Sequence, residues 1–346
     1  MMSRARDFRW SDRRVCVTGG AGFIGGWLVR ALLADGASVV GAVRPKGRTS
    51  PILEDLRRKE FVLFETNLDD ADALGRMFRE HQIDTVFHLA ANNENTDFSQ
   101  SVLPIFESNV RATYHVLEAC RLCAPQIKRL IIASSREANQ AVDGDRPLHP
   151  YAASKRCAEI IARAFAESYG LPLGTVKSDN VYGGGDLNFK RLVPSVIKSL
   201  FEGNPPTLRQ GASLSRGYIY VEDMVPALKL SAASVEDEAR HGQTFSFQAE
   251  ETVTAREMVD RIASIMGKDE ITPVVAEATL RERVHVPEPA LAYEEGLTWQ
   301  PQVPLEKGLE ATVAWYEAYF RRQRAPDMAP IQGCRDDGPA SGQTNR

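Results

Sequence analysis

The glycine-rich turn near the amino end constrains the fold of this chain more than any other feature. Gly19, Gly22 and Gly25 are spaced three residues apart, after an apolar run at 14–18 and before a stretch with helical periodicity. In a strand–turn–helix unit, such glycines permit a tight turn, let the backbone approach a pyrophosphate and let the helix pack against the strand. The amides at the start of the helix would then face the phosphates. The predicted dinucleotide contacts here are Gly19, Gly22, Phe23, Ile24 and Gly25.

Short apolar runs alternate with helical patterns along the first 180 residues. Strands that alternate with helices form parallel sheets with helices on both faces. The sequence therefore predicts an α/β fold, with a doubly wound parallel sheet of the Rossmann type and a smaller C-terminal α/β part that binds substrate. We expect strands at 14–18, 39–43, 61–65, 85–89, 130–134 and 173–177, and helices at 24–34, 71–81, 105–123 and 154–169.

The pattern changes after residue 180, where glycine and proline become frequent. We expect an N-terminal extension at 1–13 and a dinucleotide-binding Rossmann domain at 14–180, which also receives segments from the C-terminal half. A substrate-binding domain is expected at 181–322. The last segment, 323–346, is rich in polar residues, glycine and proline and has little to bury, which predicts a disordered tail.

Charge and composition exclude several classes of partner. A net charge of −4 gives no basic face for nucleic acid, and no run approaches the ~20 apolar residues of a membrane-spanning helix. The cysteines are odd in number and scattered, which is typical of a reducing cytoplasm. Cys120 and Cys123 form a CxxC pair, but no second pair of soft ligands is suitably spaced, so we expect no metal site.

The end of the second predicted strand bears on the choice of cofactor. NAD sites usually carry an acidic residue there, which binds the ribose 2′-hydroxyl. This chain has Arg44, followed by more basic residues and no acid, and a guanidinium can pair with a 2′-phosphate. NADP is therefore favoured over NAD, unless these cations are solvated loop residues. Further cofactor contacts are expected after the third and fourth strands, at Asn67, Leu68, Leu89, Ala90 and Ala91.

The strongest chemical signal after the glycines is a tyrosine–lysine pair. Tyr151 and Lys155 are four residues apart, so on a helix they share a face. The lysine charge, with that of an oxidised nicotinamide, would lower a phenol pKa that is ordinarily about 10, which makes Tyr151 a base for a substrate hydroxyl.

Two residues after the fifth strand complete this predicted centre. Ser135 is expected to orient the substrate hydroxyl. Glu137 lies where open parallel sheets bind ligands and is a candidate base for a proton alpha to a ketone, although it could also be a solvated loop carboxylate.

Further motifs follow in order along most of the chain, from about residue 14 to residue 320. They occupy residues 18–25, 88–91, 109, 134–137, 151–155, 180–183, 216–223 and 296–299. Together these residues resemble the extended short-chain dehydrogenase/reductases, specifically the NAD-dependent epimerase/dehydratase family that acts on nucleotide sugars.

The resemblance implies a Rossmann domain that holds the cofactor and a smaller part that holds a nucleoside-diphosphate sugar. It implies a cofactor contact at Asn109 and a homodimer formed through the helices at 105–123 and 154–169. Residues 183–194 are similar to CDP-glucose 4,6-dehydratases, whereas 43–44 are similar to GDP-mannose 4,6-dehydratases, so the nucleoside base stays open. The implied substrate contacts are Asn180, Arg191, Leu192 and Arg216.

Two departures from the family pattern affect the expected reaction. Dehydratases usually carry an acid where this chain has Arg136, and a guanidinium cannot donate a proton near neutral pH. Residues 138–140 also differ from the usual Val-Tyr-Gly. The leading hypothesis is 4,6-dehydration of a nucleoside-diphosphate hexose, with Glu137 as the base at C5. The alternatives are a 4-epimerase, a decarboxylase or reductase that uses the same site, and a non-catalytic dinucleotide-binding sensor.

Overall fold

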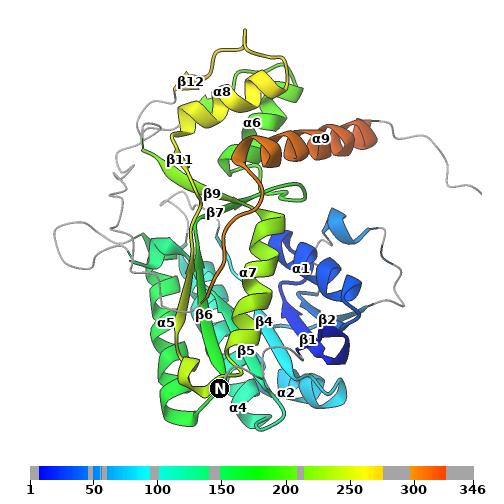
Figure 1. Ribbon diagram of the computed structural model, residues 1–346, viewed down its shortest axis with the longest axis vertical. Coiled ribbons are helices and arrows are strands. Elements are labelled where there is room, and N and C mark those ends of the chain that lie inside the picture. Colours follow the sequence, from blue (N-terminus) through cyan, green and yellow to red (C-terminus); the bar gives the residue numbers. More distant parts are fainter. Residues whose placement is uncertain are drawn as a thin grey trace, which may run out of the picture.

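A seven-stranded parallel sheet forms the centre of the computed structural model, in the order β3-β2-β1-β4-β5-β6-β10 (Figure 1). This confirms the predicted doubly wound Rossmann-type sheet, in which the strand order reverses between β1 and β4. The structure describes residues 8–45, 50–54, 56, 61–93, 101–139, 149–208, 214–275 and 297–324. The strands of the sheet are β1 (Arg14–Thr18), β2 (Ser38–Val43), β3 (Val62–Glu65), β4 (Thr85–His88), β5 (Arg129–Ala133), β6 (Leu173–Ser178) and β10 (Thr244–Phe247).

Helices cover both faces of this sheet because its strands are apolar on both sides. Val15 and Val17 of β1 belong to the apolar cluster under one layer of helices, while Cys16 between them belongs to the cluster under the other. The first layer contains α1 (Phe23–Ala34) and α7 (Val221–Ser234); the second contains α2 (Ala71–Glu80), α4 (Ala112–Leu122) and α5 (Pro150–Tyr169).

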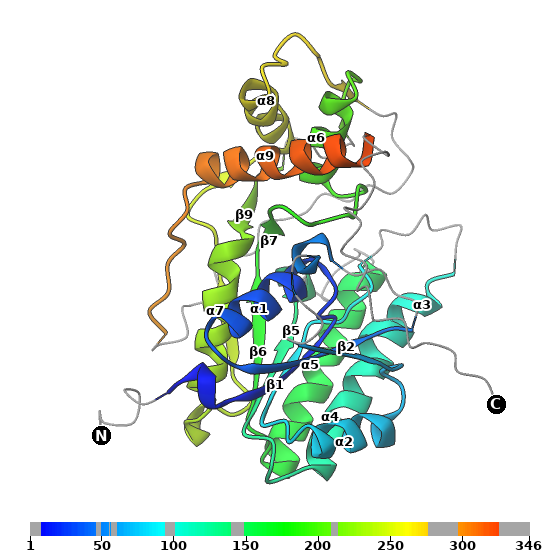
Figure 2. The same ribbon diagram turned by 90° about the vertical axis from the view of Figure 1, so that its right-hand side faces the viewer.

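A smaller lobe lies beyond one end of the sheet, where α6, α8 and α9 gather (Figures 1 and 2). Its own apolar cluster includes Ile197, Ile262 and Tyr316. The lobe contains α6 (Leu192–Phe201), α8 (Ala255–Ile265), α9 (Leu305–Arg324) and the short strands β7 (Asn180–Tyr182), β8 (Thr207–Leu208), β9 (Arg216–Tyr220), β11 (Thr252–Val253) and β12 (Val274–Val275).

Several elements differ from the ranges that the sequence predicts. The helix α5 begins at Pro150 rather than at residue 154, with His149 as its N-cap. The helix expected at 105–123 is α3 (Leu103–Phe106), a π-helical turn at Glu107–Arg111 and then α4. Helix α9 includes residues 323 and 324, which were predicted to belong to the tail. The rest of the predicted tail lies outside the described residues.

Short one-turn helices complete the described secondary structure, at Trp10–Asp12, Pro51–Leu53, Arg136–Asn139 and Glu238–Arg240. Within the described ranges, no helix is both long enough and apolar enough to cross a membrane.

Candidate active site

The glycine turn joins β1 to α1 and packs closely on neighbouring backbone. Gly19 has a φ of +71°, and a Cβ on it would come within 2.9 Å of the Ala90 nitrogen. A Cβ on Gly25 would come within 2.1 Å of the Gly19 oxygen. Gly22 is the N-cap of α1 and makes no side-chain cap hydrogen bond. The first-turn amides of α1, which include those of Phe23 and Ile24, are therefore available for an anion such as a pyrophosphate.

The other predicted cofactor residues follow the carboxyl ends of adjacent strands. The parallel register aligns Thr18 with Ala42 and His88, and Ala42 with Phe64. Residues just beyond those positions therefore share one edge of the sheet with the glycine turn. They are Arg44 and Asn67, both exposed, Leu68, which packs on the second apolar cluster, and Leu89, Ala90 and Ala91. The basic residues after Pro45 lie outside the described part of the chain.

Tyr151 lies in the first turn of α5 and is partly buried, close to the segment that follows β5. Its phenol is close enough to Ser135 for that side chain to lower its pKa. Burial and the charge of Glu137 raise the pKa of Tyr151 to about 12, against the opposing effects of Arg191 and Ser135. The predicted lowering of this pKa by Lys155 is therefore not found among the protein groups, since burial outweighs them.

Lys155 lies one turn further along α5 and is buried. Its Nζ donates a hydrogen bond of 2.8 Å to the carbonyl oxygen of Ala133. Burial lowers the pKa of Lys155 to about 8, and the charge of Glu159 acts in the opposite direction. The ammonium is thus fixed at the end of β5, and with a pKa of about 8 it still carries its charge at pH 7.

Glu137 lies in the one-turn helix that follows β5, and its amide donates to the Ser135 hydroxyl at 3.2 Å. Burial raises the pKa of Glu137, while the charges of Arg216 and Arg191 lower it. A raised pKa makes a carboxylate a stronger proton acceptor.

Arg136 points away from this centre. Its guanidinium pairs with Asp179 at 2.6 Å, and the second carboxylate oxygen of Asp179 accepts from the Ala249 amide at 2.9 Å. The arginine therefore connects the end of β5 to the segments after β6 and β10. A sequence reading alone missed this pair, because the two residues are 43 positions apart.

The predicted substrate residues come from the smaller lobe. Arg191 is the N-cap of α6 and pairs with the buried Asp186 at 2.9 Å, and Leu192 packs on the lobe's apolar cluster. Arg216 is exposed at the start of β9. Asn180 is also exposed, and its amide donates to the Gly217 oxygen at 3.3 Å. Both arginines are close enough to Glu137 to lower its pKa.

Comparisons with known proteins identify the family of this chain. Residues 15–246 match the model of the NAD dependent epimerase/dehydratase family. The chain belongs to this family. The predicted resemblance is therefore confirmed, and with it the expectation of an enzyme rather than a non-catalytic sensor.

Individual members of the family match nearly the whole chain. dTDP-glucose 4,6-dehydratase 1 of Escherichia coli is 28% identical and covers 88% of this chain and 92% of its own length. The structure of UDP-glucose 4-epimerase from Thermotoga maritima with UDP-glucose is 25% identical, with a TM-score of 0.76 over 89% of this chain and 99% of that one. The DesIV dTDP-glucose 4,6-dehydratase of Streptomyces venezuelae, with NAD bound, is 26% identical, with a TM-score of 0.76 over 88% and 97%.

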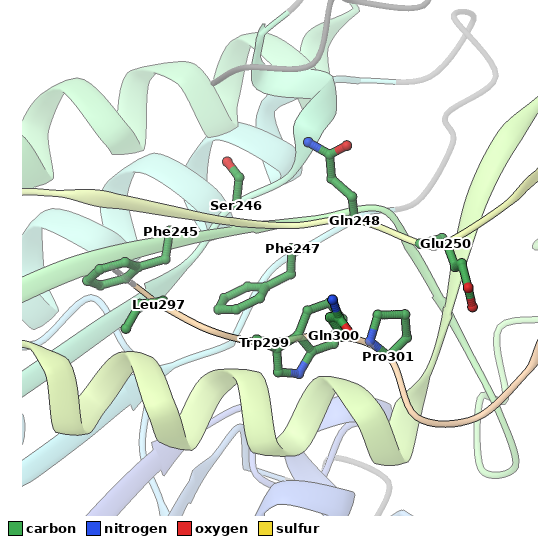
Figure 3. A pocket seen from close by; sticks show the side chains of 10 residues that line it. Phe245, Ser246, Phe247, Gln248, Glu250, Leu297, Trp299, Gln300 and Pro301 are labelled. Atoms are coloured by element: carbon green, nitrogen blue, oxygen red, sulfur yellow. The ribbon is translucent and has the colours of Figure 1, made fainter. Parts of the chain in front are cut away.

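The protein also has a cavity of about 330 Å³ that is lined by none of the predicted site residues. It lies between β10 and the segment at 297–301, and Figure 3 shows Phe245 and Phe247 directed toward Leu297 and Trp299. The rings of Phe247 and Trp299 meet edge to face at 5.0 Å. These rings belong to the apolar cluster that also contains residues of α7.

Proposed function

We propose that the protein is a nucleoside-diphosphate-sugar 4,6-dehydratase. The observation that carries this proposal is the partly buried carboxyl group of Glu137, which acts electrostatically on the phenol of Tyr151 and is itself influenced by two arginines. A dehydratase needs a base for C5 in addition to the tyrosine that serves the C4 hydroxyl, whereas simple oxidation at C4 does not.

The glycine turn and the bare first turn of α1 fit a bound dinucleotide, since its pyrophosphate would satisfy amides that no side chain caps. Such a cofactor supplies a hydride acceptor for C4, a hydride donor for C6 and a positive charge near the phenol. The residues that would hold it are those of the glycine turn, those after β2, β3 and β4, and Tyr151 and Lys155. Asn109, the other predicted contact, is only 1% exposed, and its side chain bonds Asn92 and Ser154, so it would act on the cofactor through these neighbours.

The protein's own groups would divide the proton transfers. Ser135 orients the C4 hydroxyl, and Tyr151 takes its proton as the carbon is oxidised. The C4 ketone acidifies C5, and Glu137 takes that proton. Because burial raises the pKa of Glu137, the same carboxyl can return the proton to the departing C6 hydroxyl, which leaves as water. When the hydride is returned to C6, C5 takes up a proton from solvent by way of Glu137, and Tyr151 releases its proton to solvent. Arg136 is not needed as an acid.

Arg191 and Arg216 suit the substrate diphosphate, because guanidinium groups bind phosphate oxygens in pairs. Both lie in the smaller lobe and act electrostatically on Glu137, so they would hold the phosphates close to the reacting sugar.

The test is incubation of the purified protein with UDP-, CDP-, GDP- and dTDP-hexoses, followed by mass spectrometry. Dehydration removes one water from one of these substrates. The Glu137→Gln variant should still oxidise C4, seen as reduced-cofactor absorbance, but should release no dehydrated product. Full dehydration by this variant would refute the role of Glu137.

A nucleotide-sugar 4-epimerase is the second candidate, and one observation favours it. Arg136 replaces the usual acid of dehydratases, and its pairing with Asp179 leaves Glu137 as the one carboxyl of this segment near the phenol. An epimerase would use Ser135, Tyr151 and Lys155 without any base at C5. The same incubation separates the candidates, since epimerisation leaves the product mass unchanged.

For the cofactor, we propose NADP in preference to NAD. Arg44 is exposed after β2, and neither it nor Pro45 offers a carboxylate to a ribose hydroxyl. Isothermal titration with both cofactors tests this proposal. Tighter binding of NADP, lost on Arg44→Ala, supports it, whereas tighter binding of NAD contradicts it.

A homodimer through α4 and α5 is also proposed. Apolar side chains on and next to these helices are well exposed, with Leu103 at 66% and Ile160 at 60%. Unburied apolar area of this kind is typical of interaction surfaces.

A further inference from the structure

A line of buried polar residues lies between the glycine turn and the helix that carries Tyr151. Each of its members is no more than 2% exposed, and each comes from a different element of the fold. Buried polar groups are stable only when their hydrogen-bonding capacity is satisfied. The members are Thr18 of β1, His88 of β4, Asn109 of the π-helical turn, Thr113 of α4 and Ser154 of α5.

The ring of His88 lies between two hydroxyl groups. Its Nδ1 is 2.8 Å from Thr18 Oγ1, and its Nε2 is 3.0 Å from Thr113 Oγ1. The Thr113 hydroxyl donates its one hydrogen to the carbonyl oxygen of Asn109 at 2.7 Å. Thr113 must therefore accept from His88, which places the ring hydrogen on Nε2.

The other side of the ring follows from this assignment. With its hydrogen on Nε2, a neutral His88 accepts at Nδ1 from the Thr18 hydroxyl. The oxygen of Thr18 in turn accepts from the Ala90 amide at 3.3 Å. One arrangement of hydrogens thus satisfies all of these groups, and it begins at Ala90, the residue against which Gly19 packs.

The line continues from Asn109 to the catalytic helix. The Asn109 amide donates to Ser154 Oγ at 2.9 Å, and the Ser154 hydroxyl donates to the Tyr151 carbonyl oxygen at 2.7 Å. Two further bonds fix the Asn109 side chain to the backbone of Asn92, at 2.7 and 2.8 Å. The first turn of α5 is therefore attached, through five side chains, to the backbone beside the glycine turn.

We propose that His88 is a positioning residue, whose neutral Nε2–H tautomer connects the glycine turn to the first turn of α5 and so fixes the phenol of Tyr151 relative to the dinucleotide. Burial supports this role, because together with the Lys155 charge it lowers the pKa of His88 to about 3. With a pKa of about 3 the ring is neutral near pH 7, so its two bonds keep their direction. Only the kinetic part of the test below rests on the proposed function.

The first experiment is ¹⁵N NMR of the histidine rings in the full-length protein. His88 is identified by the signal missing from His88→Gln. The expected result is an Nε2–H tautomer that does not change between about pH 5 and pH 8, unlike an ordinary histidine with a pKa of about 6.5. The opposite tautomer, or titration in this range, would overturn the proposal.

The second experiment compares Thr113→Val with Thr113→Ser. Valine keeps the shape but removes both bonds of the hydroxyl, whereas serine keeps them and is the matched control. We expect kcat to fall about 10- to 100-fold in the valine variant with KM nearly unchanged, since a small misplacement of reacting groups is costly, and serine to restore most of the loss. Equal kcat values in the two variants would contradict the proposal.

The two experiments separate this inference from the proposed function. If the wild-type protein turns over none of the nucleotide sugars, the proposed function fails, but the tautomer of His88 and its loss in Thr113→Val are still measurable. If turnover is found and the tautomer is wrong, the positioning role alone fails.

Discussion

At the scale of single residues, the carboxylate of Glu159 interacts electrostatically with two buried lysines, Lys177 and Lys155. Glu159 pairs with Lys177 at 2.9 Å and accepts a hydrogen bond from Ser134. Its charge also raises the pKa of Lys155, against the effect of burial. Removing one partner of such a buried pair costs far more than removing a surface pair, because the other charge stays out of water.

Glu159→Gln should therefore destabilise the protein by about 3–5 kcal/mol. The matched control lies on the same helix: Glu167 forms an exposed pair with Arg163, and Glu167→Gln should cost ~0.5 kcal/mol or less. Urea denaturation of both variants measures the difference. Similar losses in the two would show that the Glu159 pair behaves as a surface pair.

Lys155 also predicts a pH dependence of stability. Its pKa falls from 10.5 to about 8 on folding, so below pH 8 the folded protein carries a cost that disappears as the pH rises toward 10.5. Lys155→Met lacks this cost. The free energy of unfolding of the variant should therefore exceed that of wild type most clearly below pH 8. At ~1.4 kcal/mol per pKa unit, removing the charge should stabilise the variant by up to about 3 kcal/mol. The loss of the hydrogen bond to Ala133 reduces this gain.

Chemical denaturation of both proteins at pH 7 and pH 10 measures this effect. Losing the hydrogen bond to Ala133 shifts both values alike, so only the change with pH is diagnostic. A difference in unfolding free energy that stays constant between the two pH values would contradict the lowered pKa.

Residue-scale chemistry was predicted from the sequence where it depends on short spacing. Tyr151 and Lys155 are four residues apart, and Ser135 and Glu137 follow one strand, so their meeting could be inferred. The pairs of Arg136 with Asp179 and of Glu159 with Lys177 depend on how β5, β6 and α5 are stacked. This stacking cannot be inferred from any local sequence pattern. The raised pKa of Tyr151 could not be inferred either, because it results from burial in the folded protein.

At the scale of elements, the close packing of α1 on the glycine turn makes a sharp prediction. Gly25→Ala should abolish dinucleotide binding, because its Cβ would lie 2.1 Å from the Gly19 oxygen, and backbone cannot yield as a side chain can. Gly75→Ala in α2 is the control, since its nearest contact is the flexible end of Arg79 at 3.4 Å. Cofactor titration should show binding lost in the first variant and retained in the second.

Element boundaries were predicted well where apolar runs are bounded by turns, as in β1, β4 and β6. They were missed where the signal is unusual. Helix α5 begins with Pro150 after a histidine cap, although serine, threonine, aspartate and asparagine are the common caps. The seventh strand, β10, was not predicted as a sheet member, because only its pairing with β6 reveals that role.

At the scale of the whole molecule, the exposed apolar residues of α4 and α5 bear on assembly. Ile160→Glu should convert the proposed dimer to monomers, since a charge on that face cannot be buried without a partner. Val275 is similarly exposed, at 67%, but lies in β12 of the smaller lobe, so Val275→Glu should leave assembly unchanged. Light scattering after size-exclusion chromatography measures the molecular mass of both variants. A monomeric wild-type protein would contradict the dimer.

Strand β10 comes much later in the sequence than the other strands of its sheet, and this limits how the enzyme can be recombined with its relatives. The strand covers the edge of β6, and α7, just before it, packs on α1. Residues 221–247 therefore complete the large sheet, although elements of the smaller lobe lie both before and after them in the chain. A chimaera with one crossover near residue 180 would therefore pair a foreign strand and helix with the native sheet. An exchange of sugar preference needs two crossovers or more, which leave 221–247 with its own first half.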